Sequence, residues 1–300
     1  MLKIAYHELY QHPLPEGHRF PMLKYELIPK QLLHEGVITE QNLFAPDIIS
    51  EEDILLTHDP YYWNRMKNLE LTAAEMRKIG FPLSAQLVER EQRIAQGTID
   101  CTTYALQHGV ALNVAGGTHH AFAYKGEGFC LLNDFAVAAN YLLHRKNFTR
   151  ILIIDLDVHQ GNGTAQIFSN ESKVFTLSMH GKNNYPFFKE HSSLDIELQN
   201  GINDDIYLQL MRQHIPEVIV EFKPQFIFYL SGVDILETDR YGKLNISREG
   251  CYERDKLVFN WCKHYNIPIV VSMGGGYSPK ISDIVNAHCN TFKLASEIFF

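Results

Sequence analysis

The chain has 300 residues, a hydrophobic content of 45% and a formal net charge of -8, which allows a sizeable core but argues against a general phosphate-binding surface. Direct nucleic-acid binding is therefore not expected, and no apolar run approaches the ~18 residues that suggest a membrane span. The five cysteines are scattered and form no CxxC pair, which favours a reducing cytoplasmic location, or a nuclear one if the source is eukaryotic, over a disulfide framework.

The N-terminal third contains three segments whose apolar residues follow helical spacing. The first runs from Phe20 to Glu35 and is interrupted by Pro29. The other two, Glu70 to Gly80 and Leu83 to Ile94, are separated by Gly80 and Pro82, residues typical of a helix boundary. We therefore predict three helices in this part of the chain.

The remaining two thirds alternate short apolar runs with polar, helix-like stretches. The runs are apolar on both faces, which is typical of strands in a parallel sheet covered by helices. No repeat, low-complexity tract or linker interrupts the chain, so we predict one domain over residues 1–300. Its expected fold class is α/β: an open, mostly parallel, multi-stranded sheet with helices on both faces. The predicted strands are Ala111–Ala115, Ile151–Val158, Val174–Met179, Gln225–Leu230 and Pro268–Met273, with helices at Asn133–Leu143 and Tyr207–Glu221.

Four of these apolar runs lead directly into polar residues suited to chemistry. In open α/β sheets, ligands bind beyond the carboxyl ends of the strands. Parallel strands would bring the four segments to one edge of the sheet, so we predict that they form one pocket. The segments are Gly116-Gly117-Thr118-His119-His120, Asp155 to Gly163, Ser231-Gly232-Val233-Asp234 and Gly274-Gly275-Gly276-Tyr277.

The second segment carries the strongest indication of a metal site. Asp155, Asp157 and His159 are two residues apart, which turns their side chains toward the same side of an extended chain. Buried carboxylates need a partner or a metal. Asp157, His159 and Asp234 together offer two oxygens and one nitrogen, with a fourth position open as in catalytic zinc sites. Iron, cobalt or manganese would accept the same ligands; the alternative is that the acids cap helices and the histidine is structural.

The neighbouring segments supply groups for proton transfer and charge stabilisation. An imidazole of His119 or His120 can take a proton from metal-bound water and return it to a departing amine. Asp155 is placed to hold one of these rings. Tyr277 follows three glycines, which allow close approach of backbone to a ligand, and its phenol can donate to an oxyanion. A structural histidine pair and a core tyrosine are the alternatives.

Five motifs along the chain resemble those of the histone deacetylases in the arginase/deacetylase superfamily. They occur in the family's order and span most of the sequence. The motifs are GGTHHAF (116–122), GEGFCLLND (126–134), IDLDVHQGNGT (154–164), SGVDIL (231–236) and MGGGY (273–277).

The resemblance implies a role for each matching residue. The implied catalytic residues are His119 and His120 as the acid/base pair, Tyr277 as the oxyanion donor and Asp155 as the residue that orients His119. The implied zinc ligands are Asp157, His159 and Asp234. A monovalent cation, K+ or Na+, is implied near Asp155, Asp157, His159 and Ser178. The implied substrate-binding residues are Gly128, Phe129, Tyr185 and Gly275 along a narrow tunnel, and Arg19 near an internal cavity where the released acid leaves.

One position departs from many members of the family. Asn162 stands where they carry an aspartate that partners the second histidine. An amide orients His120 but does not stabilise its protonated form as a carboxylate does, so we expect the pKa of His120 to be lower than in those relatives. Asn162, together with segments 18–25, 232–247 and 254–259, most resembles the class IV deacetylases and their bacterial relatives.

The sequence therefore predicts zinc-dependent hydrolysis of the amide bond of an N-acyl-lysine, with the acyl length left open. One alternative is a deacetylase of small acetylated amines such as acetylpolyamines, since the acidic balance suits either a polyamine or a basic tail. A two-metal ureohydrolase is disfavoured because Asp234-Ile235-Leu236 lacks the second acid that such sites need. A catalytically weak acyl-lysine reader is the alternative outside enzymes.

Overall fold

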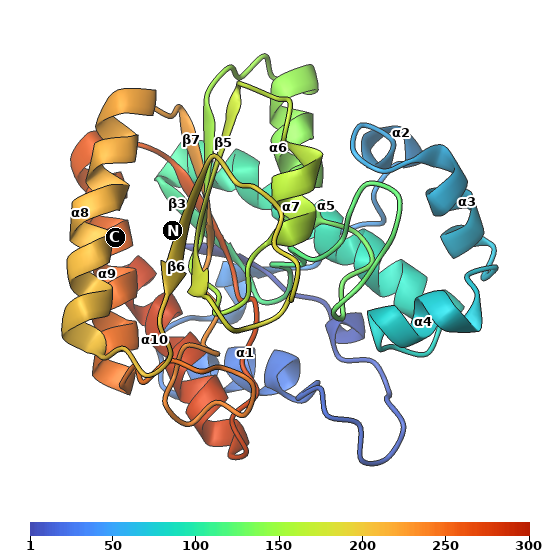
Figure 1. Cartoon of the computed structure of the whole chain (residues 1–300), viewed down its shortest axis with the longest axis horizontal. Coiled ribbons are helices and arrows are strands. Elements are labelled where there is room, and N and C mark those ends of the chain that lie inside the picture. Colours follow the sequence, from blue (N-terminus) through green and yellow to red (C-terminus); the bar gives the residue numbers. More distant parts are fainter.

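Eight strands form one sheet in which every neighbouring pair is parallel (Figure 1). The computed structural model describes residues 1–300. The strands lie in the order β2-β1-β3-β8-β7-β4-β5-β6. Their bounds are β1 Lys3–Ala5, β2 Leu43–Phe44, β3 Val110–Asn113, β4 Ile151–Asp155, β5 Val174–Gly181, β6 Leu194–Leu198, β7 Phe226–Leu230 and β8 Ile269–Ser272. The predicted open parallel sheet is confirmed.

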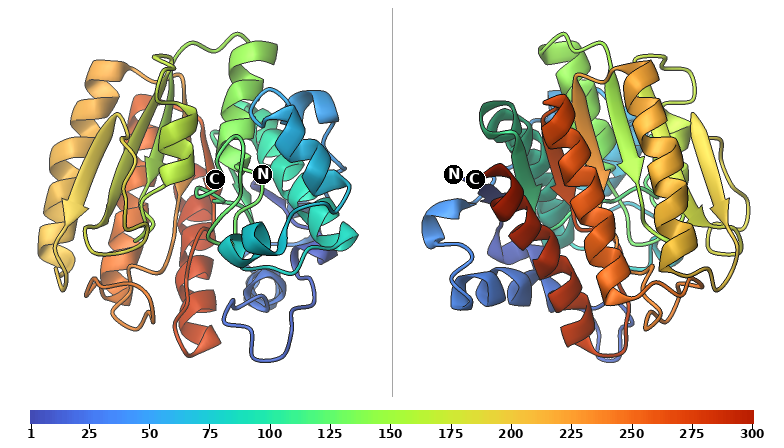
Figure 2. Two further views of the ribbon diagram at one scale, coloured as in Figure 1. Left: turned by 45° about the vertical axis from the view of Figure 1, so that its right-hand side comes forward. Right: turned by 90° about the vertical axis from the view of Figure 1, so that its left-hand side faces the viewer.

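The four central strands are buried along their whole length, as their apolar and β-branched sequences predict. Helices cover both faces: α8, α9 and α10 lie on one side, with α1 against α10, and α5 and α6 lie on the other (Figures 1 and 2). The helices are α1 Lys24–His34, α2 Glu51–Ile54, α3 Pro60–Lys67, α4 Ala73–Ile79, α5 Ala85–His108, α6 Asp134–Arg145, α7 Asn162–Ile167, α8 Asp204–Phe222, α9 Arg248–Tyr265 and α10 Ile281–Phe299. No helix is both long enough and apolar enough to cross a membrane.

The predicted helices are present, but several bounds differ. Pro29 lies inside α1 without ending it. The helix expected to end at Ile94 continues to His108 as α5, where polar residues such as Thr98 and Thr102 are buried and hydrogen-bonded. Thr98 donates to the Asp134 carboxylate and Thr102 to the Ile99 carbonyl, so these polar residues are buried where the apolar periodicity used for the prediction fails. Strands β1, β2 and β6, which are short or lie near the sheet edges, and helices α2, α3, α7, α9 and α10 were not predicted from the sequence.

The strand order explains why the four polar segments meet. They follow β3, β8, β7 and β4, which are four consecutive strands of the sheet. Because neighbouring strands lie about 4.8 Å apart, the carboxyl ends of these four strands span only about 15 Å. The loops after them therefore share one edge of the sheet, near the lower end in Figure 1.

Candidate active site and metal centre

Three side chains at this edge bring ligand atoms together in the way a metal ion requires. Asp157 and His159 follow β4, and Asp234 follows β7; one ligand atom from each lies within 4.8 Å of the others. His159 Nδ1 is 3.1 Å from Asp157 Oδ1 and 3.2 Å from Asp234 Oδ2. The two carboxylates are fully buried, so their charges need compensation.

The backbone holds these carboxylates in place. The amide of Gly275 donates to Asp157 Oδ2 at 2.8 Å, and the amide of Val158 donates to Asp234 Oδ1 at 3.0 Å. A Cβ on Gly275 would lie 2.0 Å from Asp234 Oδ2 and 2.8 Å from Asp157 Oδ2. Glycine is therefore required at position 275 because the chain passes so close to the two ligands.

The electrostatics of the cluster favour the binding of positive charge. Burial and repulsion from Asp157 raise the pKa of the Asp234 carboxyl to about 7. Burial alone would lower the pKa of His159, but its hydrogen bonds with Asp157 and Asp234 outweigh this and raise it to about 10. Protons thus stabilise the negative charge here, and a bound divalent cation would displace them. The donor set fits zinc, iron or cobalt.

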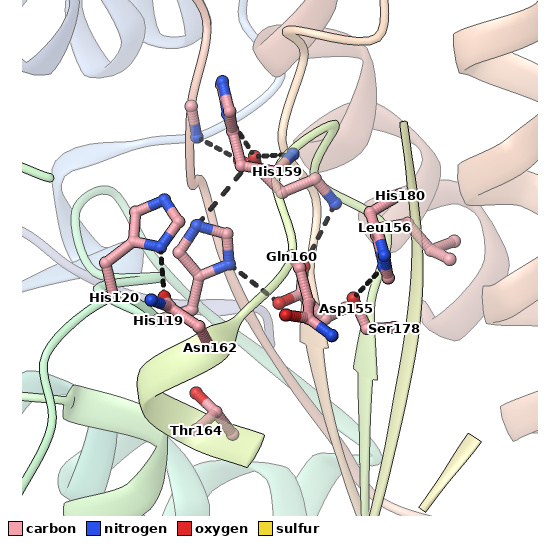
Figure 3. Close-up of polar contacts among 12 residues, drawn as sticks. His119, His120, Asp155, Leu156, His159, Gln160, Asn162, Thr164, Ser178 and His180 are labelled. Carbon is pink, nitrogen blue, oxygen red and sulfur yellow. Dashed lines mark hydrogen bonds and ion pairs between the residues drawn. The ribbon is translucent and has the colours of Figure 1, made fainter. Parts of the chain in front are cut away.

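The two adjacent histidines have different partners (Figure 3). Nδ1 of His119 donates to Asp155 Oδ2 at 2.7 Å, as expected. Nδ1 of His120 donates to Asn162 Oδ1 at 2.6 Å. The ring centroids are 4.1 Å apart and both side chains are buried. With each Nδ1 engaged, the Nε2 atoms are left for a substrate or a water molecule.

The different partners separate the two pKa values. Burial would lower the pKa of His119, but the carboxylates of Asp155 and Asp157 raise it above the ordinary value. Burial, with the nearby His119 and His159, lowers the pKa of His120 well below the ordinary value. The hydrogen bond with Asn162 acts in the opposite direction but is outweighed, and the comparison with relatives that carry an aspartate stays a prediction.

Glu127, which contacts Asn162, was not predicted from the sequence. The Asn162 amide donates to Glu127 Oε1 at 2.8 Å, and the Tyr185 hydroxyl donates to the same oxygen at 2.9 Å. A carboxylate only accepts hydrogen bonds, so Asn162 must direct its NH2 group toward Glu127 and its carbonyl toward His120. Lys125 Nζ lies 3.1 Å from Glu127 Oε2. Glu127 is part of the GEGFCLLND motif, but nothing in the sequence links it to Asn162 or Tyr185.

Two cavities meet at this cluster. The outer one has a volume of about 310 Å³ and the inner one of about 40 Å³. Both are lined by His120, Gly128, Phe129, His159 and Tyr277. The Tyr277 side chain therefore lies where the cavities join.

The predicted tunnel residues line the outer cavity. Gly128 and Phe129 have φ of 57° and 67°, and their amides donate to the carbonyls of Lys78 and Ile79. A Cβ on Gly128 would lie 2.7 Å from the His120 ring. Tyr185 also lines this cavity, whereas Gly275 lines the inner one.

The expected position of Arg19 is wrong. Its exposed guanidinium lies over the rings of Phe129 and Tyr241, 5.2 and 5.7 Å from their centroids, at the outer cavity. Arg90 lines the inner cavity instead. Its burial is compensated by Glu91, with which it forms an ion pair, and by the Tyr10 carbonyl at 2.8 Å. The segment before α1 has no such buried partner and runs along the surface.

Ser178 and Asp155 lie opposite each other on the neighbouring strands β5 and β4. The Ser178 hydroxyl forms a hydrogen bond of 2.9 Å with His180 Nδ1, and Asp155 Oδ1 accepts the amide of Asp157 at 3.1 Å. The monovalent cation near them stays a prediction.

Comparisons with known proteins find relatives over most of the chain. Residues 18–292 match the model of the histone deacetylase domain. The chain is 30% identical over 278 residues to histone deacetylase 2 of Arabidopsis thaliana, covering 89% of this chain and 72% of that protein. It is 42% identical over 296 residues to an uncharacterized protein of a Picosynechococcus strain, with 99% of each covered.

The chain belongs to the histone deacetylase family. The crystal structure of a histone deacetylase homologue from Aquifex aeolicus superposes with a TM-score of 0.83 at 25% identity, over 97% of this chain and 82% of that one. The crystal structure of a histone deacetylase homologue complexed with SAHA superposes with a TM-score of 0.84 at 25% identity, over 99% of this chain and 84% of that one. The chain is therefore a hydrolase of a generally metal-dependent deacetylase family, and its assignment to class IV stays a prediction.

Proposed function

We propose that the chain hydrolyses the amide bond of an N-acyl-lysine, using zinc held by Asp157, His159 and Asp234. The observation that carries this proposal is that His120, His159 and Tyr277 line both cavities at their junction. His119 and Asp157 line the inner cavity, and a ligand atom of Asp234 lies within 4.8 Å of those of Asp157 and His159. A substrate that enters through the outer cavity would place its acyl carbonyl at this junction.

The metal set fits the proposal. Two carboxylates and one imidazole, with ligand atoms within 4.8 Å of one another, leave a coordination position open, as catalytic zinc requires. Zinc bound there would supply a Lewis acid and lower the pKa of a water molecule toward ~7. Iron and cobalt would accept the same ligands.

The histidine pair would move the proton. Asp155 and Asn162 fix both rings through Nδ1, so that Nε2 of one ring can accept a proton from the attacking water. The pair can then return that proton to the lysine amine as the bond to the acyl carbon breaks. Burial of both rings excludes competing water from this exchange.

Tyr277 would stabilise the negative charge that forms on the acyl oxygen. The backbone amide of Tyr277 donates to Asp239 Oδ2 at 2.6 Å, which anchors the residue. No side chain or carbonyl of the protein accepts a hydrogen bond from the phenol, although the ring packs between Phe20, Phe129 and Tyr241. The hydroxyl is thus available to a substrate oxygen.

The inner cavity supports a short acyl group. Its volume of about 40 Å³ holds only about three water-sized groups. We therefore propose acetyl, or a group of similar size, rather than a long fatty acyl chain.

The test is hydrolysis of matched acetyl-lysine and long-chain acyl-lysine peptides by protein loaded with zinc. Asp157→Ala should abolish turnover, because it removes a ligand that no neighbouring residue replaces. Asp205→Ala, at an exposed position at the start of α8, is the matched control and should retain it. If folded, zinc-loaded protein cleaves neither peptide, the proposal is refuted. A non-catalytic protein that binds acyl-lysine would then be the better alternative.

A further inference from the structure

The charge that surrounds the outer cavity is opposite to that of the chain. The residues lining this cavity include three cations, Arg19, Lys78 and Lys243, and no aspartate or glutamate. The chain as a whole has a formal net charge of -8. Positive charge is therefore concentrated at the place where a substrate must enter.

The three cations come from separate segments and are free to bind an anion. Arg19 precedes α1, Lys78 is near the end of α4, and Lys243 lies between β7 and α9. All three are exposed, and none forms an ion pair with a carboxylate of the chain. Lys243 Nζ donates to the Asn183 carbonyl at 2.7 Å, which places its charge at the rim.

Two acids of the site, Glu127 and Asp239, do not line the outer cavity. Glu127 accepts from Asn162 and Tyr185 and pairs with Lys125. Asp239 accepts the backbone amides of Tyr241 and Gly242, both at 2.8 Å, in addition to that of Tyr277. The mouth therefore presents positive potential to an approaching substrate.

We propose that the outer cavity selects acyl-lysines whose flanking residues are acidic. This inference rests on the proposed deacylase function. With the lysine side chain in the tunnel, the peptide backbone lies at the mouth, and carboxylates on either side can reach the three cations. Arg19 is suited to a carboxylate because its guanidinium can donate two parallel hydrogen bonds. A polyamine or a basic tail would be repelled, although the total charge of the chain suits both.

The expected preference is moderate because the charges are exposed. A surface ion pair typically changes an equilibrium by about two- to threefold, so three together give about a tenfold preference. Salt should reduce it, since charges separated by more than ~8 Å are largely screened at physiological ionic strength.

The experiment compares acetyl-lysine peptides of one length with acidic, neutral or basic flanking residues. We expect kcat/KM to be about tenfold higher for the acidic than for the basic peptide at low ionic strength, and the ratio to shrink at high ionic strength. In Lys78→Glu/Lys243→Glu the ratio should fall to one or reverse. Lys78→Gln/Lys243→Gln should lower the acidic-to-basic ratio to an intermediate value. This variant also places no negative charge at the C-terminal end of α4, where such a charge would destabilise the helix.

Lys173→Glu/Arg212→Glu is the control of equal charge change. Both residues are exposed, and Lys173 lies just before β5, at the opposite end of the strands from the site; the acidic-to-basic ratio should not change. Equal turnover of all peptides, a preference for the basic one, or faster cleavage of acetylputrescine than of every peptide would overturn this inference. Failure to cleave any substrate, the neutral peptide included, would instead refute the deacylase function itself.

Discussion

Replacing Glu127 by Ala should slow catalysis without removing any residue that faces the substrate carbonyl. The carboxylate, whose side chain is only 12% exposed, accepts from Asn162 at 2.8 Å and from Tyr185 at 2.9 Å. A hydrogen bond to a charged group contributes about 1.5–3 kcal/mol. Without it, the Asn162 amide can turn its NH2 group toward His120, which then loses its acceptor. Because about 1.4 kcal/mol is a tenfold change in population, and partners behind catalytic residues typically cost 10–100-fold when removed, kcat should fall about 10- to 100-fold.

Two further variants test whether Glu127 acts by orienting Asn162, by its negative charge, or by holding Tyr185 in the tunnel wall. Glu127→Gln keeps an acceptor oxygen, so it should retain most of kcat if orientation of Asn162 is what matters. Tyr185→Phe removes only the hydrogen bond from the Tyr185 hydroxyl to Glu127, so it should raise KM more than it lowers kcat. The assay is steady-state hydrolysis of a neutral acetyl-lysine peptide at constant zinc occupancy. A Glu127→Ala variant with kcat within twofold of the unmodified protein would refute this reasoning.

Three other outcomes are expected. Tyr277→Phe should lower kcat about 100-fold, as loss of one oxyanion donor does, with one zinc per chain retained by elemental analysis; undiminished turnover would exclude the role. Gly275→Ala should lose zinc, because its Cβ would lie 2.0 Å from Asp234 Oδ2, and full metal content would contradict the ligand geometry. Zinc affinity in calorimetry should rise as the pH increases through about 7 and toward about 10, where Asp234 and His159 release protons. Since both pKa values are raised on folding, the metal-free protein should lose stability over that rise; a flat profile would argue against the cluster.

Much of the fold and the site could be predicted because the informative residues are local in sequence. Apolar runs mark the central strands, and the polar residues directly after them mark the active edge. The grouping of Asp157, His159 and Asp234 follows from the rule that ligands bind beyond the ends of parallel strands. Strand order could not be predicted, since pairs such as β3 and β8 are more than a hundred residues apart and their sequences differ little in character.

The errors concern residues whose role depends on a distant partner. Arg19 and Arg90 are both arginines near the N-terminal helices, and only the buried acceptors around Arg90 make an internal position possible. In the sequence Glu127 resembles an ordinary surface acid, and only the structure shows that Asn162 and Tyr185 donate hydrogen bonds to it. Such pairings are properties of the assembled structure, and local patterns do not report them.

The position of β8 has a consequence for how the protein matures. This strand is the last in the chain, yet it lies between β3 and β7 and joins two otherwise separate groups of strands. On one side, β4 and β7 lead to the proposed ligands; on the other, β3 leads to His119 and His120. Closing a gap between distant segments is intrinsically slow. The amide of Gly275, just after β8, donates to Asp157, so the last strand to be synthesised completes both the carboxylate cluster and the position of Tyr277.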